Sequence, residues 1–334
     1  MRSLASLLNA GLLGLLLPQL AVAAPADDFM AALNSRADRA PLLHRDFPDP
    51  SIIQDTAGDG TWYAVATASG NKQVQVASAP KPEGPWTYLD RDLLPDPGPW
   101  TTGKNTWAPD LRVLGKNKYV LYYSGKTKRH CVGAATATSI LGPYTPQAQP
   151  IACPEDKGGA IDPSGINDDR NGRRYITYKV DGSAIGTGGE CGNGDEPIVP
   201  TPLMLQEVST ADGFTKIGAP VQLLDRIAED GPLIEAPQIV RVADGTYILF
   251  YSSHCFNSAN YDVKYATAAD IRGPYKRAGT LLKTGSLGMS SPGGGTSIVG
   301  GGYMVLHANC DAGGSGRCMY GVKWTWSNGK ITVS

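Results

Sequence analysis

Apolar and polar residues alternate along short stretches of this chain, with the period of two expected for β-strands. The clearest examples are KYVLYYS at residues 118–124 and TYILFYS at residues 246–252. Each is followed by a stretch of small residues with strand character, VGAATATS at 132–139 and VKYATAAD at 263–270. Glycine, asparagine and proline separate these stretches and are typical of tight turns. The pattern therefore predicts an all-β protein built of short strands.

The predicted strands recur in the same order five times, about 60 residues apart. The unit consists of an apolar first strand, a tyrosine-rich second strand, a small-residue third strand and a closing Gly-Pro-aromatic turn. The first strands begin with related phrases: FPDPSII at 47–53, TWAPDLRV at 106–113, AIDPSGI at 160–166, LIEAPQIV at 233–240 and GGGTSIV at 293–299. We therefore predict a single-domain, five-bladed β-propeller with one four-stranded sheet per blade. A parallel β-helix needs a much shorter repeat, and a pair of sandwiches does not explain five units of the same order.

The beginning of the chain has the features of a secretory signal peptide. Arg2 precedes an apolar stretch at residues 7–23, which ends in the small residues of a cleavage site. We predict a signal peptide at residues 1–23, a lead-in segment at 24–44 and the propeller domain at 45–334. The mature protein is expected to be secreted and extracellular.

The charge balance bears on possible partners. Lys and Arg (30) nearly equal Asp and Glu (31), so we expect neither nucleic acid nor a membrane surface as a partner. No segment after the signal peptide has the run of about 18 apolar residues that a spanning helix needs.

Six cysteines in an exported chain indicate disulfide bonds, since the close spacings of a zinc site are absent. The pairs that we predict are Cys310–Cys318, Cys131–Cys153 and Cys191–Cys255. The sequence alone leaves the other connectivities open.

The repeated phrases carry acids that a propeller would bring together, because the first strand of each blade lines the central channel. The acids expected at one mouth of this channel are Asp49, Asp110, Asp162 and Glu235, whereas the fifth unit has glycines at residues 293–295. Crowded carboxyls differ in pKa, because like charges and burial disfavour ionisation. One protonated and one ionised carboxyl are what glycoside hydrolysis requires. Acids in turns and a calcium cage are the alternatives.

The phrases FPDPSI, WAPDL, AIDPSG and IEAPQI, in this order and spacing, resemble those of glycoside hydrolase family 43 from about Asp46 to the end of the chain. That resemblance implies a five-bladed propeller that acts on arabinans, arabinoxylans or xylans with inversion of the anomeric configuration. It also implies that Asp49 is the general base, Glu235 the general acid, and Asp162 the residue that modulates the pKa of the acid. The chain resembles the secreted fungal arabinanases and α-L-arabinofuranosidases of the family.

Four further residues are candidate substrate contacts. Trp107 and Phe47 would offer an aromatic face to the apolar side of a sugar ring; packing between blades is the alternative for Trp107. Arg317 corresponds, by the resemblance, to an arginine that family members extend from the fifth blade toward the sugar. His254 follows the second strand of the fourth unit and is either a substrate contact or an ordinary loop residue.

Two other acids are not expected to be catalytic. Asp110 follows its proline, whereas Asp49 and Asp162 precede theirs, so we interpret Asp110 as a structural acceptor. Asp46 lacks a following proline and is interpreted as a surface or loop acid.

Many family members carry a Gly-x-Gly-His signature on the fifth blade, whose histidine helps to bind an ion or water. The matching stretch here, SPGGGTS at 291–297, has no histidine. We therefore expect no cofactor and no metal site, since a central calcium would have to rely on His254 or His307.

Together these features predict an enzyme that cleaves α-L-arabinofuranosidic linkages in arabinan or arabinoxylan. We expect it to act as a monomer on plant cell-wall polysaccharide or oligosaccharide. A β-xylosidase of the same fold and an inactive polysaccharide-binding propeller are the alternatives. The glycine-rich insert at residues 182–202, which contains Cys191, is the candidate wall of the cleft and favours exo action.

Overall fold

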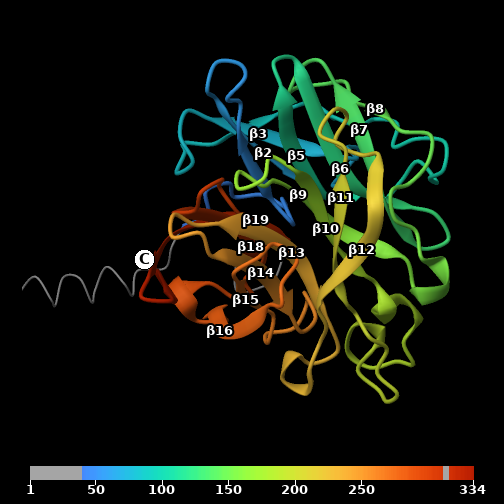
Figure 1. Cartoon of the computed structure of the whole chain (residues 1–334), viewed down its shortest axis with the longest axis vertical. Coiled ribbons are helices and arrows are strands. Elements are labelled where there is room, and N and C mark those ends of the chain that lie inside the picture. Colours follow the sequence, from blue (N-terminus) through green and yellow to red (C-terminus); the bar gives the residue numbers. More distant parts are fainter. Residues whose placement is uncertain (1–39, 311–315) are drawn as a thin grey trace, which may run out of the picture. The chain divides into compact units, whose positions relative to one another are not determined.

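The computed structural model describes residues 40–310 and 316–334, and within these ranges the chain forms short strands and no α-helix. The strands make five sheets of four strands each (Figure 1). This arrangement confirms the predicted five-bladed β-propeller. The predicted signal peptide at residues 1–23 lies outside the described residues.

The four strands of each blade follow one another along the chain. The first blade contains β1 (Ser51–Gln54), β2 (Trp62–Ala66), β3 (Gln75–Ala79) and β4 (Thr87–Leu89). The second blade contains β5 (Trp107–Gly115), β6 (Lys118–Lys126), β7 (His130–Ala137) and β8 (Thr145–Pro146). The third blade contains β9 (Ala160–Asn167), β10 (Arg174–Val180), β11 (Leu203–Val208) and β12 (Lys216–Leu224).

The last two blades repeat this order. The fourth blade contains β13 (Ile234–Arg241), β14 (Tyr247–Ser253), β15 (Asp262–Ala268) and β16 (Lys276–Leu282). The fifth blade contains β17 (Gly293–Ser297), β18 (Tyr303–Asn309), β19 (Arg317–Ser327) and β20 (Lys330–Val333). Single 3-10 turns lie in the connections, namely η1 (Glu155–Lys157), η2 (Gly182–Ile185), η3 (Glu190–Gly192), η4 (Ala228–Asp230) and η5 (Ser286–Gly288).

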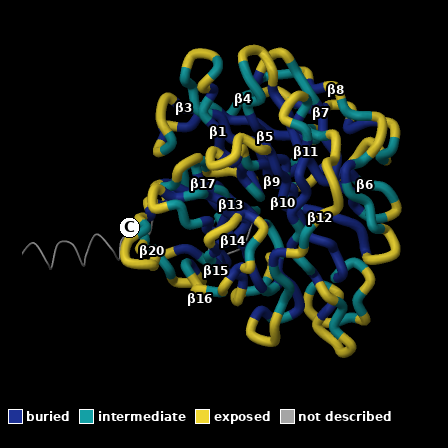
Figure 2. Tube along the Cα trace, in the orientation of Figure 1, coloured by how far each residue is buried: buried dark blue, intermediate teal, exposed yellow. Residues whose placement is uncertain are grey.

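The first strands of the five blades surround the axis of the propeller. β1, β5, β9, β13 and β17 each contact the first strands of the two neighbouring blades, so that they close a ring. Figure 2 shows these strands around the middle of the molecule, with β4, β8, β16 and β20 toward the rim. The starts of the first strands are therefore close together although they are far apart in the sequence.

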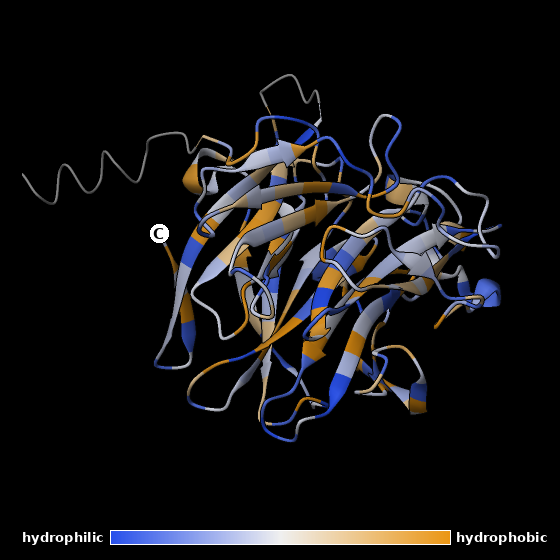
Figure 3. Cartoon of the chain, turned by 90° about the horizontal axis from the view of Figure 1, so that it is seen from above, coloured by the Kyte–Doolittle hydropathy of each residue, from blue (hydrophilic) through white to orange (hydrophobic). Residues whose placement is uncertain are grey.

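The hydrophobic core is divided among the interfaces between blades. Each of the five buried clusters joins two neighbouring blades; Phe250 of blade four, for example, packs edge-on against Trp324 of blade five at 5.4 Å between ring centroids. Hydrophobic and hydrophilic segments alternate along individual strands (Figure 3), as expected when one face of each sheet packs on the next. The apolar contacts that stabilise the fold are thus distributed over all the interfaces between blades. The region around the propeller axis is left available for a site.

The predicted Gly-Pro-aromatic turns close three of the blades. The aromatic residues Trp86, Tyr144 and Tyr275 are buried, and each donates a hydrogen bond to the carbonyl oxygen four residues earlier. The turn is therefore closed in each case by a buried aromatic ring that donates a hydrogen bond to the same backbone position.

The first described residues join the last blade to the first. The backbone N–H groups of Leu42 and Phe47 donate to the carbonyl oxygens of Met319 and Arg317 in β19, each at 2.7 Å. The Thr296 hydroxyl donates to the carbonyl oxygen of Pro50 at 2.9 Å.

In the described part of the chain, no helix is long and apolar enough to span a membrane.

All six cysteines are paired as predicted from the sequence. The disulfides are Cys131–Cys153, Cys191–Cys255 and Cys310–Cys318. The second of these ties the glycine-rich insert after β10 to the loop after β14.

Candidate active site

The repeated acid–proline phrase adopts the same backbone conformation in each blade. One residue per blade has a positive φ at this point. In blades two to five a β-bulge interrupts the pairing of the first and second strands at this residue. The left-handed residues are Asp49 (φ 54), Ala108 (φ 41), Asp162 (φ 57), Ala236 (φ 51) and Gly294 (φ 57). In the first four blades a proline follows, so in blades two to four the phrase marks the bulge.

The N–H group of each left-handed residue donates to a side chain of the preceding blade. The donor and acceptor pairs are Asp49 to His307 (3.1 Å), Ala108 to Thr67 (2.8 Å), Asp162 to Ser124 (3.0 Å), Ala236 to Asp162 (3.0 Å) and Gly294 to Ser252 (3.0 Å). The bulge is thereby held between blades, which gives the side chains around it a defined direction.

The fifth blade has glycines here because neighbouring side chains leave no room. A Cβ atom on Gly293 would lie 1.9 Å from the ring of Tyr261, and one on Gly294 would lie 2.7 Å from the ring of His307. The absence of an acid from this blade therefore follows from close packing.

A cavity of about 320 Å³ opens at the mouth of the channel. Asp49, Asp162 and Glu235, which come from three different blades, all line it. Trp107, Asp110 and Arg317 line it as well, so the fold brings together six of the residues singled out from the sequence.

Asp49 lies among groups that stabilise its charged form. Its Oδ1 atom is 3.2 Å from Nη1 of Arg317 and 3.3 Å from Nδ1 of His307, and its Oδ2 atom accepts a hydrogen bond from Thr67 at 2.6 Å. Burial raises the pKa of Asp49, but the charge of Arg317, together with hydrogen bonding from its neighbours, outweighs burial and holds that pKa well below its ordinary value. Asp49 is therefore ionised at neutral pH.

Asp162 has the opposite electrostatic environment. Burial, and then the charges of Glu235 and Asp49, raise its pKa well above the ordinary value, while Lys179 opposes this rise. Its Oδ2 atom accepts the N–H of Ala236 at 3.0 Å. The cavity thus holds one carboxyl that stays ionised and another whose protonated form is favoured.

Glu235 is held by hydrogen bonds at both oxygens. Lys179 Nζ lies 3.1 Å from Oε2, and the Tyr261 hydroxyl donates to Oε1 at 2.8 Å. These contacts leave only a small part of the Glu235 side chain, 13%, exposed to the cavity. Its carboxyl group consequently has a fixed orientation.

Asp110 has the contacts of a structural acceptor. It is buried and accepts hydrogen bonds from the Ser51 hydroxyl (2.5 Å) and the Gly165 N–H (2.7 Å), with Arg112 Nη2 at 2.8 Å. It therefore joins the first strands of blades one, two and three. Asp46 is exposed and accepts the N–H of Arg317 at 3.0 Å, in agreement with its interpretation as a surface acid.

The two aromatic candidates differ in position. Trp107 is 39% exposed at the cavity and stacks on buried His130, with ring centroids 3.6 Å apart. Phe47, in contrast, is fully buried between blades one and five and packs edge-on against Tyr88. The expectation that Phe47 contacts the sugar is therefore corrected, because its ring has no exposed face.

Of the other two candidates, Arg317 lines the cavity and His254 does not. Arg317 lies at the cavity, and its guanidinium group lies 4.8 Å from the ring centre of Phe256, which also lines it. His254 is not among the residues that line the cavity and packs against Gly231, so it does not contact this space. The insert contributes Ser183 and Cys191 to the cavity wall.

The sequence analysis did not identify several residues that line the cavity, among them Lys179, Asp181, Tyr261 and Phe256. A signal for Lys179 was present, because TYKVDG has a lysine where the second strands of blades two and four have Ser124 and Ser252. A lysine in an otherwise apolar strand requires a charged partner.

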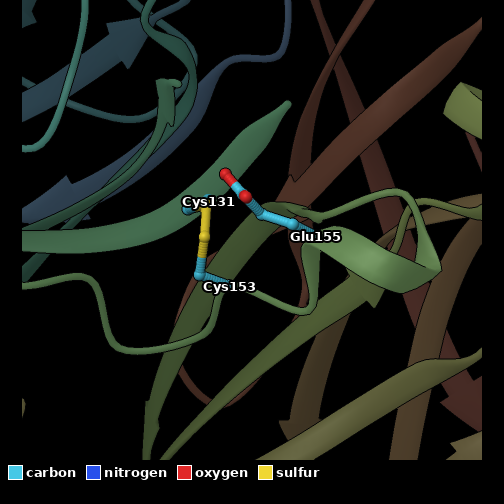
Figure 4. Close-up of side chains that lie close together, drawn as sticks. All are labelled: Cys131, Cys153 and Glu155. Atoms are coloured by element: carbon cyan, nitrogen blue, oxygen red, sulfur yellow. A yellow bond between two sulfur atoms is a disulfide. The ribbon is translucent and has the colours of Figure 1, made fainter. Parts of the chain in front are cut away.

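Among the described residues, the acids and histidines at the cavity do not form a compact group of three or more metal ligands. The carboxyls at the cavity are engaged by protein donors, and Nε2 of His307 is the one unpartnered atom beside Asp49. Cys131, Cys153 and Glu155 form a compact group elsewhere (Figure 4), but the two sulfur atoms are joined in a disulfide and have no thiolate to bind a metal.

A family model described as glycosyl hydrolases family 43 matches residues 39–330. The chain belongs to this family. The resemblance noted in the sequence motifs is thereby confirmed.

Relatives of this family 43 chain include proteins described as arabinanases. A probable arabinan endo-1,5-alpha-L-arabinosidase A from Aspergillus flavus is 35% identical over 136 residues, which cover 39% of this chain and 40% of the relative. An extracellular endo-alpha-(1->5)-L-arabinanase 2 from Bacillus subtilis is 30% identical over 106 residues, covering 29% of this chain and 22% of the relative. The matched stretches thus span less than half of either relative.

Solved structures of family 43 proteins share the fold. A thermostable family-43 glycoside hydrolase has a TM-score of 0.71 at 22% identity, covering 86% of this chain and 93% of its own. An exo-1,5-alpha-L-arabinanase from a bovine ruminal metagenomic library has a TM-score of 0.63 at 21% identity, covering 86% of this chain and 97% of its own. These similarities establish the propeller architecture.

Proposed function

We propose that this protein is a secreted, inverting glycoside hydrolase that cleaves α-L-arabinofuranosidic linkages in arabinan or arabinoxylan. The observation that carries the proposal is the convergence of Asp49, Asp162 and Glu235, from three different blades, on one cavity. Arg317 helps to keep Asp49 ionised, as a general base requires, and hydrogen bonds to both oxygens hold the Glu235 carboxyl in one orientation. A pair of carboxyl groups, one acting as base and the other as acid, is the requirement of this chemistry.

In this mechanism Asp49 is the general base and takes a proton from the water that attacks the anomeric carbon. Glu235 is the general acid and protonates the leaving oxygen from the opposite side. Asp162 is the residue that modulates the pKa of the acid, a role supported by its hydrogen bond to the N–H of Ala236, next to Glu235. Trp107 offers its exposed face to the sugar ring, and Arg317 holds Asp49 in place.

The arabinan specificity is supported by the relatives, whose names describe arabinan-cleaving enzymes. Secretion is supported by the three disulfides, since such bonds persist in oxidising compartments. The wall formed by Ser183 and Cys191 supports exo action, because it adds to one side of the cavity.

The purified protein is tested with linear arabinan, an aryl α-L-arabinofuranoside and an aryl β-xyloside. We expect release of arabinose from the first two and little reaction with the third. Hydrolysis of the xyloside alone would favour the β-xylosidase alternative, and binding of arabinan with no turnover of any substrate would favour an inactive propeller. Proton NMR of the first-formed sugar should show the inverted anomer; a retained anomer would overturn the role of Asp49.

Leaving-group dependence separates the two catalytic roles. Glu235→Ala should lose about 10²–10⁴-fold in rate on arabino-oligosaccharide and far less on a dinitrophenyl arabinofuranoside, whose leaving group needs no proton. Asp49→Ala removes activation of water, so both substrates should slow together. If Asp49→Ala spared the activated substrate and Glu235→Ala slowed both equally, the roles would have to be exchanged.

A further inference from the structure

Lys179 is a buried lysine in the second strand of blade three. Its side chain is 1% exposed. In the strand register, it lies opposite Ile161, just as Ser124 lies opposite Trp107 and Ser252 opposite Glu235. Blade three therefore has a cation where blades two and four have a small hydroxyl group.

The three protons of the Lys179 ammonium group each have an acceptor. Nζ lies 3.0 Å from Oδ1 of Asp181, 3.1 Å from Oε2 of Glu235 and 3.3 Å from Oγ of Ser183. Burial opposes the charge, but Asp181 and Glu235 outweigh burial and raise the pKa of Lys179 above its ordinary value. The ammonium is therefore charged and cannot turn away from Glu235 without losing a hydrogen bond.

Several ionisable groups surround Glu235. They are Lys179 on β10, Asp181 after it, Asp162 on β9, Asp49 before β1, His307 on β18, Tyr261 before β15 and Arg317 on β19, which lines the same cavity. Among these groups, Lys179 is the one cation in direct contact with the Glu235 carboxyl. Its effect on that carboxyl is opposite in sign to the effect of the surrounding acids.

We infer that Lys179 is a positioning residue for Glu235: its hydrogen bond to Oε2 fixes the direction of the carboxyl. This inference rests on the proposed role of Glu235 as the general acid. An ammonium in direct contact with a carboxyl favours the ionised form of that carboxyl. The alkaline limb of the pH profile, which marks the loss of the proton from the general acid, is therefore expected to depend on Lys179.

The test compares Lys179→Met with Lys179→Arg and Asp181→Asn in pH profiles of kcat/KM on arabino-oligosaccharide. Lys179→Met should move the alkaline limb up by about one pH unit. Lys179→Arg keeps the charge and should leave the limb near its original position, even if misalignment slows the reaction. Asp181→Asn removes the anion that competes with Glu235 for the Lys179 ammonium, so the alkaline limb should move to lower pH. Because this variant keeps Lys179, it provides the test if Lys179→Met does not fold.

A second measurement does not depend on substrate. The carboxyl carbon of Glu235 is followed by ¹³C NMR as the free protein is titrated, with Glu235→Gln to assign the signal. The inference would be overturned if Lys179→Met or Asp181→Asn were active and had the same alkaline limb and the same Glu235 carboxyl titration as the unmodified protein. That result would leave the proposed function intact. A carboxyl titration that shifts as expected in a protein inactive on every arabinoside would retain the action of Lys179 on Glu235 and reject the proposed function.

Discussion

Blades two and four carry the same backbone motif with different side chains. Trp107-Ala108-Pro109-Asp110 in blade two corresponds to Glu235-Ala236-Pro237-Gln238 in blade four, residue by residue. In both, an alanine with positive φ sits in a β-bulge before a proline. The residue before the alanine reaches the cavity. The residue after the proline is buried between first strands, and of the two such residues Asp110 borders the cavity whereas Gln238 does not.

The residues after the proline are part of the architecture. Asp110 bonds to blades one and three, and Gln238 exchanges two hydrogen bonds with Ser297 of blade five, at 2.7 and 2.8 Å. The comparison teaches that an acid beside a proline is not a catalytic signal by itself. Its position relative to the left-handed residue decides whether the side chain faces the cavity or the neighbouring strand.

The largest effect is expected for the buried acid of blade two. Asp110→Ala should lower the free energy of unfolding by about 3–5 kcal/mol, because Arg112 is left as an uncompensated buried charge. Urea unfolding measures this loss, and the matched variant Gln238→Ala should cost only about 1–3 kcal/mol. Full stability of Asp110→Ala with abolished catalysis would break the comparison, since Asp110 would then belong to the catalytic machinery.

The side chains next to the two cavity-facing residues also differ. Buried His130 stacks on Trp107, whereas charged Lys179 contacts Glu235. Burial lowers the pKa of His130 to about 4, below its unfolded value of about 6.5. The unfolded chain therefore binds a proton first as the pH falls, so stability should drop by up to about 3 kcal/mol between pH 6.5 and 4. His130→Gln should remove this part of the slope, whereas His254→Gln should leave it. An unchanged slope in His130→Gln would show that the ring titrates freely.

The smallest effect is expected for the aromatic residue that takes the place of Glu235 in blade two. Trp107→Ala should raise KM for arabino-oligosaccharide about tenfold, equivalent to about 1.4 kcal/mol, with little change in kcat. Trp107→Phe should retain most of the binding because it keeps an aromatic face. A drop in stability with an unaltered KM would instead assign Trp107 to packing between blades.

The repeated phrases were enough to predict the propeller, because strand alternation and turn residues are local properties and their recurrence defines the blades. Recurrence also predicted that Asp49, Asp162 and Glu235 would meet, since equivalent positions in a ring of blades converge on its axis. The cysteine pairs were predictable in part for the same reason, as Cys310 and Cys318 flank one short loop.

The tertiary structure alone decided which neighbours surround these residues. Phe47 is next to the acid phrase in sequence, yet its N–H pairs with β19 and its ring is enclosed between two blades. Lys179 and Glu235 are 56 residues apart and belong to different blades, so their contact depends on how blades three and four pack together. Local pattern determines the strands and the bulge, but burial and charge pairing depend on the residues of the next blade, and these set the protonation state of each carboxyl.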